Sequence, residues 1–422
     1  MRLNVFIVCL SLSLTLSAAA GADSGAIEVG GHTKFALTSQ SYPDQSLFRD
    51  FVGSNTLDLS GVLRLNFRAN SQRWSFDAAY QLLGLSGDSI ELGRSLPGAA
   101  NIFFPGLPND DRRLFDLTDT IEDNADTVLL HRLDRLAVGY ASEKAVIRFG
   151  RQVLSWGNGL FYAPMDLVNP FDPAAVDTEY KSGDDMLYTQ YLRDSGDDIQ
   201  AAYVIRRNLI TGDVDSDEST AAIKYHGFAG EFEYDVLLAQ SYGDSVLGFG
   251  GSKNVGGSVW TADAVVTQTD NDTYAQFVTN LTYSWSWFDR NMSGAIEYFF
   301  NGFGQRSGAY EPLDLANNPD LVERIARGEL FSIGRHYLAG SVTIELTPLW
   351  GVTPTLLANL SDPSGLLQLV TNYSLSENMT LLGSINVPLG PKGSEFGGVS
   401  AAQPDRYLSG GAGLFAQIAW YF

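Results

Sequence analysis

The sequence predicts an all-β fold, a transmembrane antiparallel β-barrel that crosses a membrane with strands. Apolar and polar residues alternate over many segments of about 9–13 residues, which is the periodicity of a strand with one apolar face. Segments of this length are long enough to cross a bilayer at a tilt. No stretch after residue 22 reaches the run of about 18 apolar residues that is expected of a membrane-spanning helix.

Residues 1–22 have the pattern of a secretory signal peptide. Arg2 precedes an apolar run over residues 3–16, and the small residues that follow offer a cleavage site. The only cysteine, Cys9, lies inside this segment. We therefore expect neither disulfides nor thiolate metal ligands in the mature chain.

The segment TLDLSGVLRLNFRAN, residues 56–70, illustrates the alternation. A short turn follows it, and the next segment alternates in the same way. A sheet with one apolar and one polar face also occurs in soluble proteins, so the number and length of such segments carry the argument. One face of this segment holds Leu57, Leu59, Leu63, Leu65 and Phe67, and the other holds Asp58, Ser60, Arg64, Asn66 and Arg68.

Connections between the predicted strands alternate between short turns and long polar segments. In barrels that span a bacterial outer membrane, short turns are periplasmic and long loops are extracellular. Residues 23–422 contain no linker, so we expect a single barrel domain with an inserted loop near 157–184. The other long segments cover residues 86–126, 208–220, 302–335 and 390–406.

The strand count depends on a glycine-rich stretch, residues 244–271. Without it the sequence predicts 16 strands. Read as two further strands, near 245–252 and 257–268 around a turn at Lys253 and Asn254, it raises the number to 18. The alternation in GGSVWTADAVVTQT favours 18.

One helix is predicted within an extracellular loop, in the sequence ANNPDLVERIARGEL. Asn318 is suited to the N-cap, Pro319 to the first helical position, and Gly328 lies near the end. The pattern favours a short helix there.

The last ten residues, GLFAQIAWYF, place apolar side chains at every second position up to Phe422. This ending resembles the closing strand of bacterial outer-membrane β-barrels of the porin type. The resemblance implies an outer-membrane location, contact with lipid and lipopolysaccharide, and a possible homotrimer. It also implies that the barrel-assembly machinery recognises the closing strand, through Ile418, Trp420 and Phe422.

The faces opposite the apolar ones are polar, which favours a solute pathway through the barrel. A barrel of 16–18 strands encloses a wider space than side chains alone fill. The alternative is that these residues pair with one another across a narrow or plugged lumen. The predicted pore-lining residues are Lys34, Asp58, Arg64, Asn66, Arg68, Arg148, Gln152, Lys224 and Glu297.

The most distinctive loop, residues 157–184, is rich in acid and stiffened by Pro164, Pro170 and Pro173. In porins the third loop folds into the barrel, and its acidic residues lie opposite basic residues on the wall. The resemblance therefore implies a constriction loop, although an ordinary solvated surface loop is the alternative. Its acidic residues would be Asp166, Asp172, Asp177 and Glu179, the last three facing Arg64, Arg68 and Arg148.

The formal net charge of −22 excludes a nucleic-acid partner on electrostatic grounds. The acid is concentrated in three predicted extracellular loops, 86–126, 166–185 and 208–220, which predicts a mild cation preference. Solubility, or divalent ions bridging to lipopolysaccharide, is the alternative use of this charge. DVDSDEST, residues 213–220, starts like a calcium loop, but Glu218 at the sixth position excludes an EF-hand.

We therefore expect an outer-membrane channel for passive or mildly selective passage of small hydrophilic solutes. The alternative is a non-catalytic barrel that binds or exports an apolar or polymeric substrate. The four histidines have no spacing that suits a catalytic triad, so we expect no enzyme activity, no metal and no cofactor.

Overall fold

The structure is a computed structural model that describes residues 27–96, 106–306 and 310–422. The predicted signal peptide, residues 1–22, lies outside the described residues. The main sheet contains 19 strands, and all of them except β4 form the wall, which gives 18 wall strands. The prediction of 18 strands is confirmed, and the alternative of 16 is wrong.

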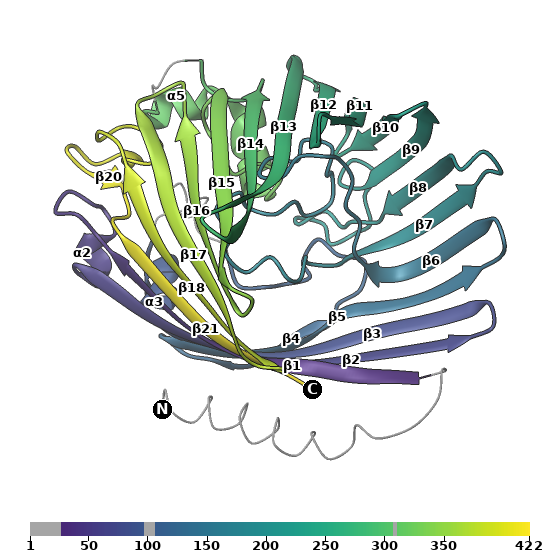
Figure 1. The fold of residues 1–422 in the computed structure, drawn as a ribbon. Helices are drawn as coiled ribbons and strands as arrows, with labels where there is room; N and C mark the ends of the chain where they lie inside the picture. The colour runs from purple at the N-terminus through teal and green to yellow at the C-terminus, as the bar shows by residue number, and fades with distance from the viewer. Residues whose placement is uncertain (1–26, 97–105, 307–309) are drawn as a thin grey trace.

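The wall strands form a ring with several connecting segments inside it (Figure 1). Their bounds are β1 Ile27–Ser41, β2 Asn55–Ser71, β3 Trp74–Gly87, β5 Thr127–Ala141, β6 Ala145–Gln152, β7 Asp184–Leu192, β8 Asp198–Val204, β9 Thr220–Ala229, β10 Phe232–Ser241, β11 Asp244–Val255, β12 Ser258–Gln268, β13 Thr273–Trp287, β14 Arg290–Asn301, β15 His336–Thr347, β16 Trp350–Asn359, β17 Ser364–Ser376, β18 Met379–Leu389 and β21 Gly413–Tyr421.

The first and last strands close the barrel. β1 pairs with β2 along one edge and with β21 along the other, and β21 also pairs with β18. The amide of Gly31 donates to the carbonyl of Phe422 at 2.8 Å, and the amide of Phe422 donates back at 3.0 Å. Closure leaves no wall strand with an unpaired edge, which a strand protein in lipid requires.

Many large apolar side chains of the wall strands lie on the outside of the barrel, and the charged side chains of these strands lie inside. On β2, Leu57 and Phe67 face outward with 45% and 37% of their surface exposed, whereas Arg64 faces inward and is 2% exposed. A soluble sheet would bury the apolar face against another layer. Here large apolar side chains of that face are exposed on many wall strands, among them Ile223, Leu247, Leu356 and Ile418, as in a barrel that lies in lipid.

The turn between β11 and β12 lies three residues beyond the predicted one. The sequence placed it at Lys253 and Asn254, but β11 continues to Val255, and the turn residues are Gly256 and Gly257. Their φ angles are +57° and +86°. Two-residue hairpin turns of this kind need positive φ at both positions, which glycine adopts without a steric penalty.

The long loops carry short helices and small strands. α2 (Arg49–Val52), α3 (Asp88–Ser95), α5 (Pro312–Ala316) and α6 (Pro319–Ala326) are all in extracellular loops. α6 confirms the predicted helix, since the Asn318 side chain accepts the amide of Leu321 at its N-terminus. In the described parts of the chain, none of the helices has the length and apolar character needed to cross a membrane.

β4 (Thr118–Asp123), which was not predicted, pairs with the extracellular half of β5. Along β5, β6 pairs with the periplasmic half and not with the extracellular half. β6 was predicted to end at residue 156, but it ends at Gln152. The early end follows Gly150, whose φ of +121° breaks the extended strand. Two further short strands, β19 (Val399–Ser400) and β20 (Tyr407–Leu408), pair within the last loop.

Candidate functional site in the barrel lumen

The segment between β6 and β7, residues 153–183, crosses the interior of the barrel (Figure 1). We call it the constriction loop. Because its partners come from strands on every side of the wall, the loop lies inside the lumen. It is hydrogen-bonded to Gln200 on β8, Asp263 on β12, Glu297 on β14, Gln368 on β17, Gln417 on β21 and Lys34 on β1.

Glu297 holds the beginning of the loop. Its carboxylate accepts three consecutive backbone amides, from Leu160 at 2.6 Å, Phe161 at 3.0 Å and Tyr162 at 2.8 Å. The side chain of Glu297 is fully buried. The sequence predicted that it lines the pore; it does point inward, but the loop covers it. Hydrogen bonds to a charged group are among the stronger ones, so Glu297 is an anchor for the loop.

Asp263 on β12 holds the loop at Asn158, two residues before the amides that Glu297 accepts. It accepts the backbone amide of Asn158 at 2.6 Å and the side-chain amide of the same residue at 2.7 Å. Apolar contacts reinforce this attachment, because the Tyr162 ring stacks on Phe299 with centroids 4.7 Å apart. Met165 packs in an apolar cluster with Leu237, Val246 and Val265 of β10–β12. The first half of the loop is thus fixed to the β10–β15 wall.

Lys181, near the end of the loop, is bonded both to the beginning of the loop and to its middle. Lys181 donates to both oxygens of Asp166, at 2.7 Å and 2.5 Å, and to the carbonyl of Leu154 at 2.7 Å. Burial raises the pKa of Asp166 to about 6, although the charge of Lys181 opposes the rise. Asp166 was predicted to be an acidic residue of the constriction. It is instead a buried partner of Lys181 within the loop.

The tip of the loop, residues 177–180, reaches the opposite wall. Asp177 and Glu179 both form ion pairs with Lys34, at 2.6 Å and 2.7 Å. Burial works against ionisation of these two carboxyls, but the hydrogen bond and charge of Lys34 hold the pKa of each below its usual range. Gln417 and Tyr421 add hydrogen bonds from β21.

These partners differ from those that the resemblance implied. Asp177 and Glu179 meet Lys34, while Arg64 is paired with Asp134 on β5 at 2.7 Å. Asp172 caps the backbone amide of Ala174, and burial raises the pKa of this carboxyl. Which wall cation meets the loop depends on the path of the loop, and the alternation along a strand does not contain that information.

Two cavities lie along the inner face of β1–β3. One, of about 640 Å³, is nearer the periplasmic end and contains five of the predicted pore residues: Arg64, Asn66, Arg68, Arg148 and Gln152. The other, also of about 640 Å³, is nearer the extracellular end, beside Asp58 and α3. Between them on β1 and β3 lie Lys34 and Gln81, which are 6% and 7% exposed.

The last predicted pore residue, Lys224, lies outside both cavities. It is buried on β9, paired with Asp235 on β10 at 3.1 Å and 6.0 Å from the ring centre of Trp156. Asp134 and Arg135 on β5 were not predicted as lumen residues. The pairing with β3 skips Asp134, and the two side chains form an ion pair at 2.7 Å. The sequence feature that could have indicated them is the group of charges at Arg132, Asp134 and Arg135 within the otherwise apolar strand β5.

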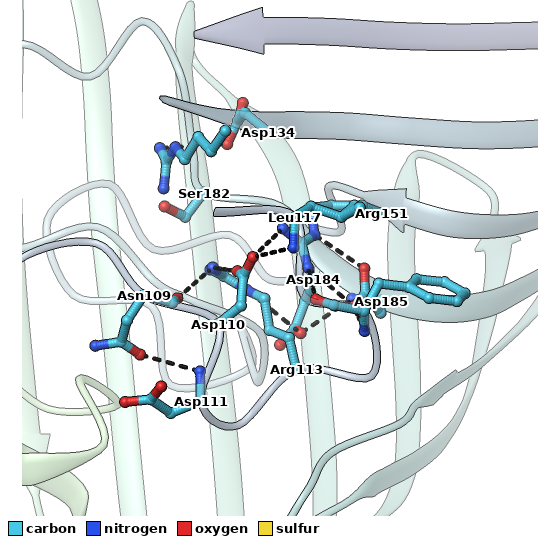
Figure 2. A network of polar contacts seen from close by, with 12 residues as sticks. Asn109, Asp110, Asp111, Arg113, Leu117, Asp134, Arg151, Ser182, Asp184 and Asp185 are labelled. Carbon is cyan, nitrogen blue, oxygen red and sulfur yellow. Dashed lines mark hydrogen bonds and ion pairs between the residues drawn. The ribbon is translucent and has the colours of Figure 1, made fainter. Parts of the chain in front are cut away.

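A buried ionic network lies at the extracellular end of β6 (Figure 2). Arg151 is 1% exposed. Its guanidinium donates to Asp185 at 2.9 Å and 3.1 Å, to Asp110 at 3.0 Å and to the carbonyl of Phe115 at 2.6 Å. Asp110 also accepts the backbone amide of Leu117 at 2.8 Å.

Beyond the early end of β6, side-chain ion pairs and a backbone bridge connect the neighbouring segments of the wall. Arg206, just beyond β8, pairs with Asp184 at 3.0 Å, and its backbone forms a bridge with Arg113. The segment from Arg113 to β4 therefore connects the end of β8 with the extracellular half of β5. The sequence predicted only a long polar loop there, because its partners are far away along the chain.

The loop between β18 and β21 also folds inward. The Glu395 carboxylate accepts the amide of Ile333 at 2.9 Å, the hydroxyl of Tyr337 at 2.6 Å and the side-chain amide of Asn359 at 2.7 Å. These donors are uncharged, and a second carboxylate, Asp362, accepts the Glu395 backbone amide. Burial raises the pKa of Glu395 to about 7.

We expect docking of residues 390–398 to weaken between about pH 4.5 and pH 7. The pKa of Glu395 in the docked loop is above its ordinary value of 4.5, so the docked state binds the proton more tightly. Its stability is therefore greatest at low pH and falls as the carboxyl ionises. Hydrogen exchange of this segment, corrected for the intrinsic rate, should show the change, and Glu395→Gln should remove it. An unchanged pH dependence in the glutamine variant would contradict this assignment.

No protein-family model and no curated protein matches this chain. Solved structures do resemble it. Acinetobacter baumannii OccAB4 has a TM-score of 0.53 at 8% identity, covering 95% of this chain and 99% of its own. A BenF-like porin from Pseudomonas fluorescens Pf-5 has a TM-score of 0.53 at 8% identity, with 94% and 98% covered.

The fold is that of a porin-type outer-membrane barrel. The chain also resembles Wzi of Escherichia coli, an outer-membrane protein involved in group 1 capsule assembly and described as a carbohydrate-binding β-barrel. Its TM-score is 0.50 at 11% identity, with 97% of this chain and 86% of Wzi covered. At these identities the likeness extends to the fold of the porin-type barrel, and the residues of the lumen have to be interpreted on their own chemistry.

Proposed function

We propose that this porin-type barrel is an outer-membrane channel for small hydrophilic solutes, without catalytic activity. The observation that carries the proposal is the lumen itself. Two cavities of about 640 Å³ each lie along one polar wall, and a loop fixed to the other wall narrows the space beside them. An apolar exterior with a polar, partly open interior suits passage of water-soluble molecules.

The charge preference depends on the narrow part of the lumen, since a field falls off within about 8–10 Å at physiological ionic strength. The mild cation preference predicted from the acidic loops remains a prediction. Several of those acids are already paired, Asp110 with Arg151, Asp166 with Lys181 and Glu218 with Arg112. The periplasmic cavity is lined by two acids, Glu28 and Asp77, and four arginines: Arg64, Arg68, Arg135 and Arg148. Arg64 and Arg135 share the carboxylate of Asp134, and Arg68 is 3.7 Å from Asp77, so the arginines exceed their acidic partners by a small margin. We propose that this excess makes the stretch favour anionic groups.

Replacing Arg68 and Arg148 with alanine should shift the selectivity of the channel toward cations. Both side chains line the periplasmic cavity, and neither holds the constriction loop. The cation-to-anion permeability ratio should rise about twofold to fivefold, the effect of roughly 0.4–1 kcal/mol per ion. Reversal potentials across a planar bilayer under a salt gradient measure this ratio. Arg193→Ala, in a periplasmic turn, is the matched control, and equal shifts in control and double variant would refute the role of the two cavity arginines.

The second candidate is a barrel that binds or exports a polymeric substrate, which the likeness to Wzi favours. The two functions separate in a bilayer recording. Stable ohmic openings support a channel, whereas silence together with binding of an oligosaccharide to the reconstituted barrel supports the second candidate.

The remaining partners are also proposals. We propose that the outward-facing residues Ile418, Trp420 and Phe422 form the signal for barrel assembly. Ile418 has 44% of its surface exposed on the outer face, where it is accessible to lipid or to an assembly factor. We also propose that the signal peptide directs export of the chain, that the barrel contacts lipopolysaccharide, and that it associates into a homotrimer.

A further inference from the structure

Lys34 occupies the middle of the wall between the two cavities. The periplasmic cavity reaches Gly31 on β1, and the extracellular cavity reaches Thr38 on the same strand. The inward-facing residues between them are His32, Lys34 and Ala36, and Lys34 is the one that carries an ammonium group. A solute that moves from one cavity to the other along β1 therefore passes its ammonium group.

A second cation and an aromatic ring complete the surroundings of Lys34. The ring of Tyr180 lies with its centre 4.3 Å from the guanidinium carbon of Arg64 and 5.6 Å from Nζ of Lys34. The same ring stacks on His32 at 5.1 Å. The side chains of Lys34 and Arg64 are 7% and 2% exposed. Arg64 is paired with the buried carboxylate of Asp134 at 2.7 Å, so Lys34 is the cation of the two whose carboxylate partners are partly exposed.

The partners of Lys34 are carboxylates of the chain itself, and they are less firmly held than the rest of the loop. Asp177 and Glu179 have 28% and 35% of their side-chain surface exposed. Their contacts to the wall are ion pairs and hydrogen bonds, while the beginning of the loop is held by Glu297 and by aromatic packing. Ion pairs with partly exposed partners contribute only about 0–1 kcal/mol each.

We propose that Lys34, with Arg64 and Tyr180, is a binding site for the anionic group of a small oxyanion, and that Asp177 and Glu179 occupy it as an internal ligand. A solute carboxylate carries the same chemical group as the two acids of the loop tip. It takes their place on Lys34, and residues 177–180 move away from β1 and open the route between the cavities. The proposal rests on the channel function proposed above.

The test uses the full mature chain in planar bilayers, with acetate as the probe. In Asp177→Asn/Glu179→Gln the internal ligand has no charge, so the site is free. We expect the single-channel chloride conductance to rise several-fold. Half-maximal inhibition of the chloride current should need about fivefold less acetate, the effect of removing roughly 1 kcal/mol of competition. Lys34→Gln should abolish the inhibition.

Two controls separate these effects from general changes. Asp289→Asn/Glu377→Gln removes one aspartate and one glutamate charge from two exposed short turns and should leave the conductance and the acetate inhibition unchanged. Heat-dependent migration in gel electrophoresis verifies that each variant is a folded barrel.

The outcomes distinguish the two proposals. If the wild type and Asp177→Asn/Glu179→Gln conduct equally and respond equally to acetate, the internal ligand is refuted and the channel stands. If neither folded protein conducts, the channel function fails, and the opening expected of the variant fails with it. A response that persists in Lys34→Gln places the anion site elsewhere and overturns the assignment.

Discussion

Glu297→Ala is expected to detach the beginning of the constriction loop and to raise the single-channel conductance several-fold. The substitution leaves three consecutive amides, those of residues 160–162, without their acceptor. A buried amide that loses its partner costs about 1–3 kcal/mol, so the loss exceeds what a single exposed ion pair contributes. The loop then moves off the β14 wall, and the width of the lumen changes.

Glu297→Gln supplies the rescue. The glutamine side chain keeps the shape and one carbonyl oxygen, which can still accept the amides of Phe161 and Tyr162, but its NH2 group cannot accept the amide of Leu160. It should therefore bring the conductance part of the way back to the wild-type value. Glu345→Ala removes a glutamate from the neighbouring strand β15, where its partner is Asn291 and not the loop. A conductance increase of the same size in Glu345→Ala would show that barrel destabilisation, and not release of the loop, causes the effect.

Arg151→Met is expected to be among the most destabilising single substitutions in this barrel. It leaves Asp110 and Asp185 buried without their shared cation, and Asp185 is fully buried. Removal of one partner from a buried ion pair costs about 3–5 kcal/mol. In detergent micelles, the urea midpoint of unfolding should fall by about 1 M or more.

The matched control is Arg193→Met, whose ion pair with Asp197 lies in an exposed periplasmic turn. Such a pair contributes about 0–1 kcal/mol, so its midpoint should hardly move. Hydrogen exchange supplies a second measurement, because the segment from Asp110 to β4 should lose protection before the rest of the wall does. Equal midpoints in the two variants would show that the network in Figure 2 is not a structural element of the barrel.

The glutamate at position 395 and the pair Asp177 and Glu179 respond to acid in opposite ways. Burial without a cation raises the pKa of Glu395, so its loop is held best at low pH. Lys34 lowers the pKa of the two acids of the loop tip, so their ion pairs are lost only as the pH falls through those lowered values. Acid therefore tightens one inward loop and, at lower pH, loosens the other.

The sequence by itself determined the barrel, because the face of a strand side chain follows from its position along the strand. The alternation in residues 56–70 assigned Leu57 to the lipid side and Arg64 to the lumen without knowledge of any neighbour. The alternation also identified the closing strand, and the order of short and long connections assigned the short turns to the periplasmic side. The alternation placed the β11–β12 turn three residues early because Gly256 and Gly257, and not the polar residues before them, provide the positive φ angles.

Only the tertiary structure decided which inward-facing residues meet. Glu297 is an anchor because the loop happens to pass over β14, and Lys34 is the cation of the loop tip although it is 143 residues from Asp177. Arg151 and Asp110 meet across 41 residues through a loop without periodicity. Alternation specifies the side of the wall on which a charge lies, but its partner depends on the path of a long loop through the lumen, and that path is set by all of its contacts together.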